Sequence, residues 1–277
     1  MNLKKLLPLL LLAPIACFAD ICKTTQDIAI DPYAAEIGTR KVTFLAVDLS
    51  THKCSAINQA GLAERHGPYS TFKIPHTLIA LETGAVQSMD ERFEWDQKKH
   101  PAKSFWPETW KQSHTLASAF QHSVVWYYKE LVPRIKPAYY KTWLARFSYG
   151  NQQFTPGSNE FWLNNELTIS PLEQVEFLAC LLKDGCGVSA KNIAAFESAA
   201  IQEGDTTYSL YAKTGAGSID PNNNDGAFNG WYVGYIKNAE GKPVTAFALY
   251  MEADSFSALK NYRKELSLQL LKDLKFM

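Results

Sequence analysis

The sequence predicts an α+β protein, in which an antiparallel β-sheet is flanked by helices and a second lobe is mostly helical. Strand patterns lie near both ends of the chain, helical patterns fill its middle, and an amphipathic helical pattern closes it. Strands that are far apart in a sequence most simply join one sheet, which places the closing helix on one face and the central helices in a second lobe.

The N-terminal part of this arrangement is a hairpin followed by a helix. Residues 40–51 alternate apolar and polar side chains, which predicts a strand, and residues 53–59 can return beside it. After Ser70, apolar side chains recur at helical spacing as far as Gly84, which ends the predicted helix.

Three helices are predicted in the middle of the chain. Residues 115–135 have a helical pattern that the S-V-V sequence at 123–125 interrupts with β-branched side chains, and residues 137–151 form a helix that closes on a glycine. The clearest pattern covers residues 170–185, where Ser170 caps the helix and Glu173 completes a capping box.

Strand patterns return near the C-terminus. Residues 208–217 are predicted to form one strand, and residues 230–252 a hairpin that turns at N-A-E-G. The amphipathic pattern of residues 263–276 predicts the final helix.

Residues 1–19 have the features of a signal peptide. Lys4 and Lys5 precede an apolar run at 6–16, which is too short to span a bilayer, and small residues follow it. We therefore expect cleavage after Ala19, a periplasmic location, and a single domain over residues 20–277 with no membrane span. A membrane anchor and a lipid attachment at Cys17 are the alternatives.

Composition argues against two other classes of protein. The chain carries 28 Lys and Arg against 28 Asp and Glu, so no basic surface favours nucleic-acid binding. Its six His show no paired metal-ligand spacing, and no metal site is expected. A monomer and a homodimer both remain open.

Four cysteines remain after the signal peptide, namely Cys22, Cys54, Cys180 and Cys186. In an exported chain an even number of cysteines permits disulfides, here in three possible pairings. We favour the local pairs Cys22–Cys54 and Cys180–Cys186, with free thiols as the alternative.

Ser70 and Lys73 form the S-x-x-K pair best suited to catalysis. The pattern occurs three times, but Ser50–Lys53 spans a turn after a strand and Ser257–Lys260 lies in a polar loop. At Ser70 it starts a helix with an apolar body, and one helical turn puts the amine on the same face as the hydroxyl. A serine needs a nearby base to become a nucleophile, and a lysine serves once burial removes its proton. A capping serine beside a surface lysine is the alternative.

The K-T-G sequence at 213–215 is a second candidate site. It lies on a predicted strand and precedes Ala216 and Gly217, so little side-chain bulk covers the backbone there. A substrate could approach this backbone closely and accept a hydrogen bond from the Ala216 N–H. A strand that simply ends in a turn is the alternative.

S-V-V at 123–125 and Y-G-N at 149–151 mean little alone, but the ordered set S-x-x-K, S-x-V, Y-G-N, K-T-G resembles the class D (oxacillinase-type) serine β-lactamases. The resemblance extends from about residue 40 to the end and includes S-T-F-K, F-W-L, S-P-L-E-Q-V-E-F-L and G-W-Y-V-G-Y-I. It implies the fold shared by serine β-lactamases and penicillin-binding transpeptidases. It also implies hydrolysis of β-lactam antibiotics, and thereby resistance to them.

The resemblance further implies catalytic roles. Ser70 would attack the lactam carbonyl, and Lys73, converted by CO2 to N6-carboxylysine, would be the general base. Trp162 would hydrogen-bond this carbamate, and Ser123 would relay a proton to the lactam nitrogen. Apart from CO2 or bicarbonate, no cofactor is implied.

Binding residues are implied in the same way. The N–H groups of Ser70 and Ala216 would form the oxyanion hole. Val125 would cover Lys73 with apolar surface. Arg263 would bind substrate, and the alternative is that it is a surface arginine at the start of a helix. Of the residues predicted to bind substrate, Lys213, Thr214 and Arg263 would bind the drug's carboxylate. The full set is Val125, Tyr149, Asn151, Lys213, Thr214, Gly215 and Arg263.

Two features qualify the resemblance. Many members place a bulky residue after K-T-G, whereas this chain has Ala216 and Gly217, and a long polar loop at 218–230 follows, so the substrate range stays open. The related class A enzymes activate water with a glutamate four residues before an asparagine. Here Ser170 occupies the asparagine position, and Glu166 is expected to be a solvated loop residue.

Two other functions share these motifs. A β-lactam sensor domain would be acylated without turnover, and a penicillin-binding transpeptidase would act on cell-wall peptides. Known sensors carry the domain behind transmembrane segments, and the sequence shows no such segment beyond the signal peptide.

Overall fold

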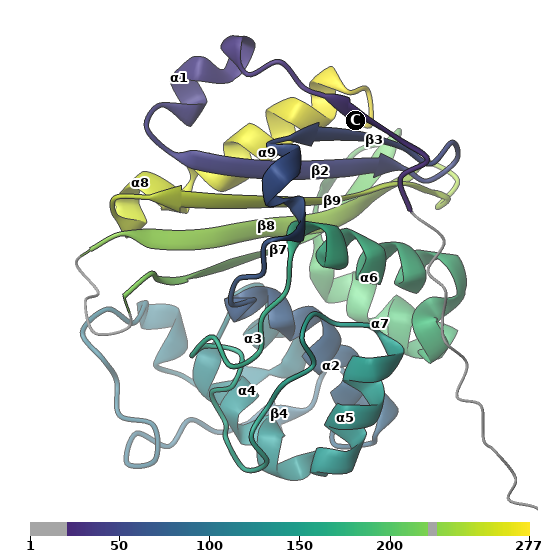
Figure 1. Cartoon of the computed structure of the whole chain (residues 1–277). Coiled ribbons are helices and arrows are strands. Elements are labelled where there is room, and N and C mark those ends of the chain that lie inside the picture. The colour runs from purple at the N-terminus through teal and green to yellow at the C-terminus, as the bar shows by residue number, and fades with distance from the viewer. Residues whose placement is uncertain (1–20, 221–225) are drawn as a thin grey trace, which may run out of the picture.

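A sheet that contains strands from both ends of the chain organises the protein (Figure 1). The computed structural model describes residues 21–220 and 226–277, and in these ranges the sheet has seven strands in the order β1-β3-β2-β9-β8-β7-β6. The predicted signal peptide at 1–19 lies outside the described residues. The strands are β1 Thr24–Asp27, β2 Lys41–Asp48, β3 Lys53–Ile57, β6 Ile201–Gly204, β7 Tyr208–Ser218, β8 Phe228–Asn238 and β9 Pro243–Ala253.

The predicted antiparallel pairing is correct except at one edge. Every neighbouring pair in the sheet is antiparallel apart from β1, which runs parallel to β3. The β1 sequence T-T-Q-D lacks apolar alternation, so the pattern gives no sign of this strand. The Cys22–Cys54 disulfide joins the segment before β1 to β3 and holds the edge together. The second favoured disulfide, Cys180–Cys186, is also present.

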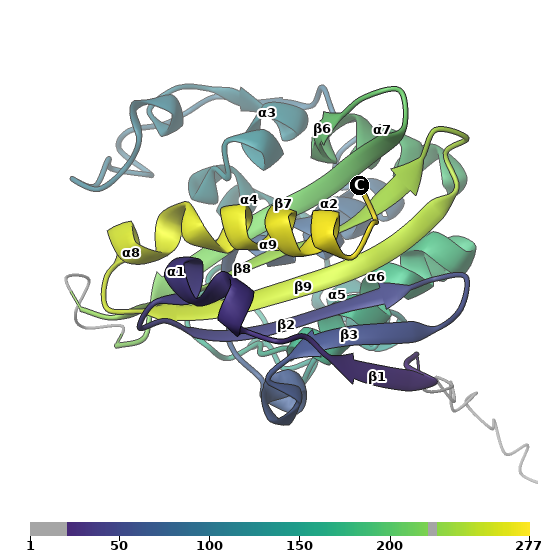
Figure 2. The same ribbon diagram turned by 90° about the horizontal axis from the view of Figure 1, so that it is seen from above.

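Helices cover both faces of the sheet, as Figures 1 and 2 show. One face carries α1 Ala34–Ile37, α8 Phe256–Lys260 and α9 Tyr262–Asp273. The other face carries a helical lobe that consists of α2 Lys73–Glu82, α3 Leu116–Gln121, α4 Val125–Leu131, α5 Pro137–Arg146, α6 Pro171–Asp184 and α7 Ala190–Ala200, with a small ribbon of β4 Arg92–Phe93 and β5 His114–Thr115. The predicted α+β fold with a helical second lobe is confirmed. In the part of the chain that the structure describes, no helix is both long enough and apolar enough to span a bilayer.

Alternating strand residues form two separate hydrophobic cores. On β2, Phe44 belongs to the core under α9, whereas Leu45 and Val47 belong to the core shared with the helical lobe. This division follows from the two-residue period of a strand, which sends neighbouring side chains to opposite faces. Both faces of the sheet are therefore buried, and the helical lobe is fixed against one of them.

Two local expectations are corrected, and one helix is added. The helix predicted over 137–151 ends at Arg146, so the Y-G-N motif lies in the turns that follow it. Ser257–Lys260 falls within α8 rather than in a polar loop. Helix α7 was not predicted from the sequence, although the Ser189 side chain caps it by accepting a hydrogen bond from Asn192 N–H.

Gly150 lets the Y-G-N turn approach a neighbouring loop closely. Its φ is +56°, and a Cβ placed there would lie 1.9 Å from the Thr168 carbonyl oxygen. The Asn151 side chain ties the same two segments together, since its Nδ2 donates to the Glu166 carbonyl at 2.8 Å and its Oδ1 accepts from Thr168 N–H at 3.0 Å. A side chain at position 150 would therefore separate two segments that are held together.

We expect Gly150→Ala to lower the free energy of unfolding by about 3 kcal/mol, because strain at positive φ and a clash with backbone combine. Gly84→Ala is the matched control, since Gly84 has φ +68° with no atom within 4 Å of the added Cβ. Its cost should be about 1 kcal/mol. Urea unfolding of both variants measures the difference, and equal losses would contradict the role given to Thr168.

Candidate active site

Ser70 lies on a short 3-10 helix, Tyr69–Phe72, that leads directly into α2. The residue before this turn is Pro68, and no side chain caps it, so the Ser70 hydroxyl is not a helix cap. Instead, Ser70 Oγ lies 2.9 Å from Lys73 Nζ. The alternative of a capping serine with a surface lysine is therefore wrong.

Several buried hydrogen bonds fix the turn that carries Ser70. The Trp231 indole N–H on β8 donates to the Gly67 carbonyl at 2.8 Å. On the other side, Gln174 of α6 donates to Thr71 Oγ1 at 2.9 Å, and Thr71 Oγ1 donates to the Pro68 carbonyl at 2.7 Å. The sheet and α6 together hold the candidate nucleophile in place.

Lys73 is buried at the N-terminus of α2, with only 1% of its surface exposed. Burial lowers the pKa of its amine well below the ordinary value, and the positive charge of Lys213 lowers it further. The amine also lies 5.1 Å from the centre of the Tyr128 ring. A neutral amine at hydrogen-bond distance from Ser70 can accept the hydroxyl proton, which is what a nucleophilic serine requires.

Trp162 is fully buried and contacts the aromatic rings of Phe72, His76 and Phe161. Within residues 21–220 and 226–277 its indole Nε1 has no hydrogen-bond partner. A buried donor without a partner is costly, so this N–H has room for an acceptor that the polypeptide does not supply. A carbamate oxygen is an acceptor of this kind, and the predicted hydrogen bond between Trp162 and a carbamate on Lys73 stays a prediction.

Ser123 and Lys213 come together from the two lobes. Ser123 lies between α3 and α4 with φ +60°, and its Oγ is 3.0 Å from Lys213 Nζ on β7. The same amine donates to the Thr214 carbonyl at 3.1 Å. Burial first, and the charge of Arg263 second, lower the pKa of Lys213 to about 7. The pair can therefore pass a proton near neutral pH. Val125, the first residue of α4, lies two positions beyond Ser123.

The K-T-G strand lies directly against the turn that carries Ser70. A Cβ on Gly215 would lie 2.8 Å from the Pro68 carbonyl and 3.1 Å from Thr71 N, and one on Gly217 would overlap the Tyr69 ring. Strand β6 pairs with β7 only as far as Tyr211, so the edge of β7 beyond it faces this turn. The arrangement places Gly215 beside the backbone of residues 68–71, the turn that includes Ser70, and the predicted contact of Ala216 with the oxyanion stays a prediction.

Arg263 lies in the first turn of α9 but is buried, with 6% of its surface exposed. Burial lowers the pKa of its guanidinium to about 10. Its Nε and Nη1 have no partner among the residues that the structure describes, and Nη1 lies 2.9 Å from the Cβ position of Gly230 on β8. The surface-arginine alternative is wrong, and a buried cation with free donors suits an anionic ligand.

Tyr149 and Asn151 make contacts within the fold. Tyr149 is fully buried between Phe72 and Phe177, and the Asn151 amide is engaged with residues 166 and 168. Their predicted contact with substrate stays a prediction. Glu166 is half-exposed in a turn, as expected for a loop residue.

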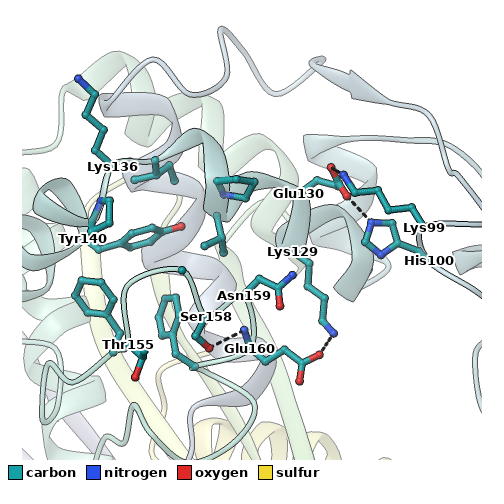
Figure 3. A pocket seen from close by; sticks show the side chains of 17 residues that line it. Lys99, His100, Lys129, Glu130, Lys136, Tyr140, Thr155, Ser158, Asn159 and Glu160 are labelled. Carbon is teal, nitrogen blue, oxygen red and sulfur yellow. Dashed lines mark hydrogen bonds and ion pairs between the residues drawn. The ribbon is translucent and has the colours of Figure 1, made fainter.

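A separate cavity of about 580 Å³ lies between α4, α5 and the loop at 154–161. Figure 3 shows that ion pairs join several of its polar side chains, with Lys129 next to Glu160 and with Lys99 and His100 both next to Glu130. No residue predicted for the active site lines it. The only described cluster with metal-ligand geometry is Cys180, Asp184 and Cys186, whose two sulfurs form a disulfide.

Comparisons with known proteins agree with this geometry. The family described as penicillin binding protein transpeptidase domain matches residues 42–274. The probable β-lactamase YbxI of Bacillus subtilis is 37% identical over 202 residues, which are 73% of this chain and 72% of that protein. A class D β-lactamase structure from Sebaldella termitidis is similar with a TM-score of 0.81 and 29% identity, over 92% of this chain and 99% of that one. The C-terminal domain of the Bacillus licheniformis BlaR penicillin-receptor gives a TM-score of 0.79 and 25% identity, over 90% and 96%.

The lowered pKa of Lys213 predicts how stability depends on pH. The unfolded chain binds a proton at this lysine up to its ordinary pKa of 10.5, whereas the folded protein releases it near 7, so stability rises with pH across this window. We expect Lys213→Met to stabilise the protein, and to do so by about 2 kcal/mol more at pH 7 than at pH 9. Urea unfolding at both pH values measures this, with Lys264→Met controlling for general loss of a lysine charge. A Lys213→Met effect that is the same at both pH values would refute the lowered pKa.

Proposed function

The chain belongs to the class D serine β-lactamases, and we propose that it hydrolyses β-lactam antibiotics with Ser70 as nucleophile and a carboxylated Lys73 as general base. The observation that carries this proposal is the buried amine of Lys73, 2.9 Å from Ser70 Oγ, with its pKa well below the ordinary value. Such an amine is a base at neutral pH, and it is also the form that reacts with CO2.

Acylation uses both lobes of the protein. The carbamate proposed on Lys73 would accept the proton of Ser70, and Oγ would attack the lactam carbonyl carbon while the N–H groups of Ser70 and Ala216 stabilise the negative oxygen. The C–N bond then breaks, and Ser123 gives its proton to the nitrogen. Lys213, 3.0 Å away, replaces that proton.

Deacylation requires a base that remains after acylation. A carbamate on Lys73, held by the Trp162 N–H, would supply an anionic acceptor for the proton of Ser70 and later for that of the hydrolytic water. Trp162 supports this assignment because its indole N–H is buried without a partner in the described parts of the chain. Val125, at the start of α4, would cover the lysine with apolar surface.

The substrate's carboxylate would bind between β7 and α9. Lys213 and Arg263 are both buried, and burial lowers the pKa of each because it disfavours the charged form. An anionic ligand stabilises the charged form of both side chains and thereby raises their pKa values again. Thr214 on the same strand would add a hydroxyl donor.

A sensor function is the alternative, because the BlaR penicillin-receptor domain has the same fold. A sensor stops at the acyl-enzyme, whereas an enzyme turns over. A transpeptidase would act on cell-wall peptides instead of clearing the drug with water. The YbxI relative, named a probable β-lactamase, favours turnover.

We also propose that the protein works in the periplasm after removal of residues 1–19. The two disulfides support an oxidising compartment. The mass of the protein in solution will distinguish a monomer from a homodimer.

Turnover with and without bicarbonate tests this function. We expect the purified protein to hydrolyse a penicillin and a chromogenic cephalosporin repeatedly, and to lose most of this activity in CO2-depleted buffer at mildly acidic pH, where protonation of the amine competes with carboxylation. Lys73→Ala should remove turnover in both buffers. An acyl-enzyme that forms and never clears would favour the sensor, and turnover indifferent to CO2 would exclude the carbamate.

Arg263→Ala should weaken substrate binding more than chemistry. Loss of one charge-assisted contact to the carboxylate is expected to raise KM about tenfold, with kcat changed by less than about threefold. Lys264→Ala, the next residue on α9, is the matched control and should leave both constants near wild type. A fall in kcat with an unchanged KM would remove Arg263 from carboxylate binding.

A further inference from the structure

His76 is a buried titratable residue that the mechanism above does not use. It lies one helical turn beyond Lys73 on α2 and is fully buried. Burial, together with the nearby charge of Lys73, lowers the pKa of its imidazole to about 3, so the ring is neutral at working pH.

The imidazole contacts the ring that supplies the unpartnered donor of the active site. His76 and Trp162 meet edge to face, with ring centroids 5.4 Å apart. Phe72 and Phe161 are the other rings against the indole. These phenyl rings carry no polar atom, so only His76 can be oriented by a hydrogen bond.

Tyr140 of α5 supplies that hydrogen bond. Its hydroxyl lies 2.6 Å from His76 Nε2, and both groups are buried. The terminal torsion of a histidine is otherwise broad, so this bond selects one orientation of the ring. The Tyr140 ring itself lines the separate cavity, where it is labelled in Figure 3.

We propose that Tyr140 and His76 are positioning residues that hold the Trp162 indole N–H toward Lys73 and thereby set how firmly the enzyme retains CO2. The pair acts through Trp162 and touches neither the nucleophile nor the substrate. This inference rests on the carboxylated lysine proposed above. Its consequence is that CO2 affinity depends on the buried hydroxyl of a tyrosine that also lines a cavity outside the active site.

Tyr140→Phe tests the proposal because it keeps the ring and removes only the hydroxyl. Hydrolysis of a chromogenic cephalosporin is measured against bicarbonate concentration, and ¹³C-bicarbonate is used to follow the carbamate carbon by NMR. We expect the bicarbonate needed for half-maximal activity and half-maximal signal to rise about fivefold, the effect of losing one orienting hydrogen bond. Saturating bicarbonate should restore kcat, and KM should stay unchanged.

Tyr139→Phe is the matched control, because Tyr139 is an exposed residue next to Tyr140 on α5 and the substitution removes the same hydroxyl group. It should match wild type. His76→Phe, which also lacks the hydrogen bond, should show the same rise as Tyr140→Phe and serves as the second variant if either one folds poorly in a thermal melt.

A double-mutant cycle with Trp162→Phe separates this route from general loosening of the site. Because the pair acts through the indole, Tyr140→Phe should add nothing in the Trp162→Phe background. Effects that multiply would overturn the proposal, as would an unchanged half-saturation in Tyr140→Phe. A wild type with no carbamate signal would instead refute the carboxylated lysine itself.

Discussion

The burial of one lysine amine beside one serine hydroxyl is the constraint on which this structure depends. Lys73 would carry a charge in water, and the fold removes it from water with only Ser70 at hydrogen-bond distance among the described residues. Taking an amine into an apolar interior is unfavourable, so other parts of the protein must stabilise the arrangement. The aromatic side chains around α2, and the hydrogen bonds from Trp231 and Gln174 to the Ser70 turn, provide that stability.

The same principle explains the other half of the site. Lys213 and Arg263 bring two more basic side chains into the protein interior, and the described residues around them place no carboxylate within ion-pair distance of either. The site is therefore least stable when empty, and binding of an anionic substrate stabilises the two charged side chains. Active sites commonly lower the stability of the free protein in this way, because catalysis requires groups that do not stabilise the fold.

Patterns in the sequence predicted the long elements and the ordered motifs well, because apolar periodicity and turn residues record both. They failed where stability comes from tertiary contacts. Strand β1 has no alternation and depends on the pairing with β3 and the Cys22–Cys54 disulfide. The role of Arg263 depends on burial, which a helix-start position does not reveal. His76 gave no signal at all, since its importance comes from Tyr140 and Trp162, far along the chain.

The order of strands in the sheet bears on when the protein folds. Strand β9 lies between β2 and β8, and α9 covers one face, so the last residues made complete both cores. Strands β1, β2 and β3 leave the ribosome first and pair with one another, but the second edge of β2 has no partner until β9, residues 243–253, is made. The seven-stranded sheet therefore cannot be complete until synthesis is almost finished. An unfolded polypeptide is the form that can be threaded through a translocation channel, so a sheet that is completed last would suit the export proposed above.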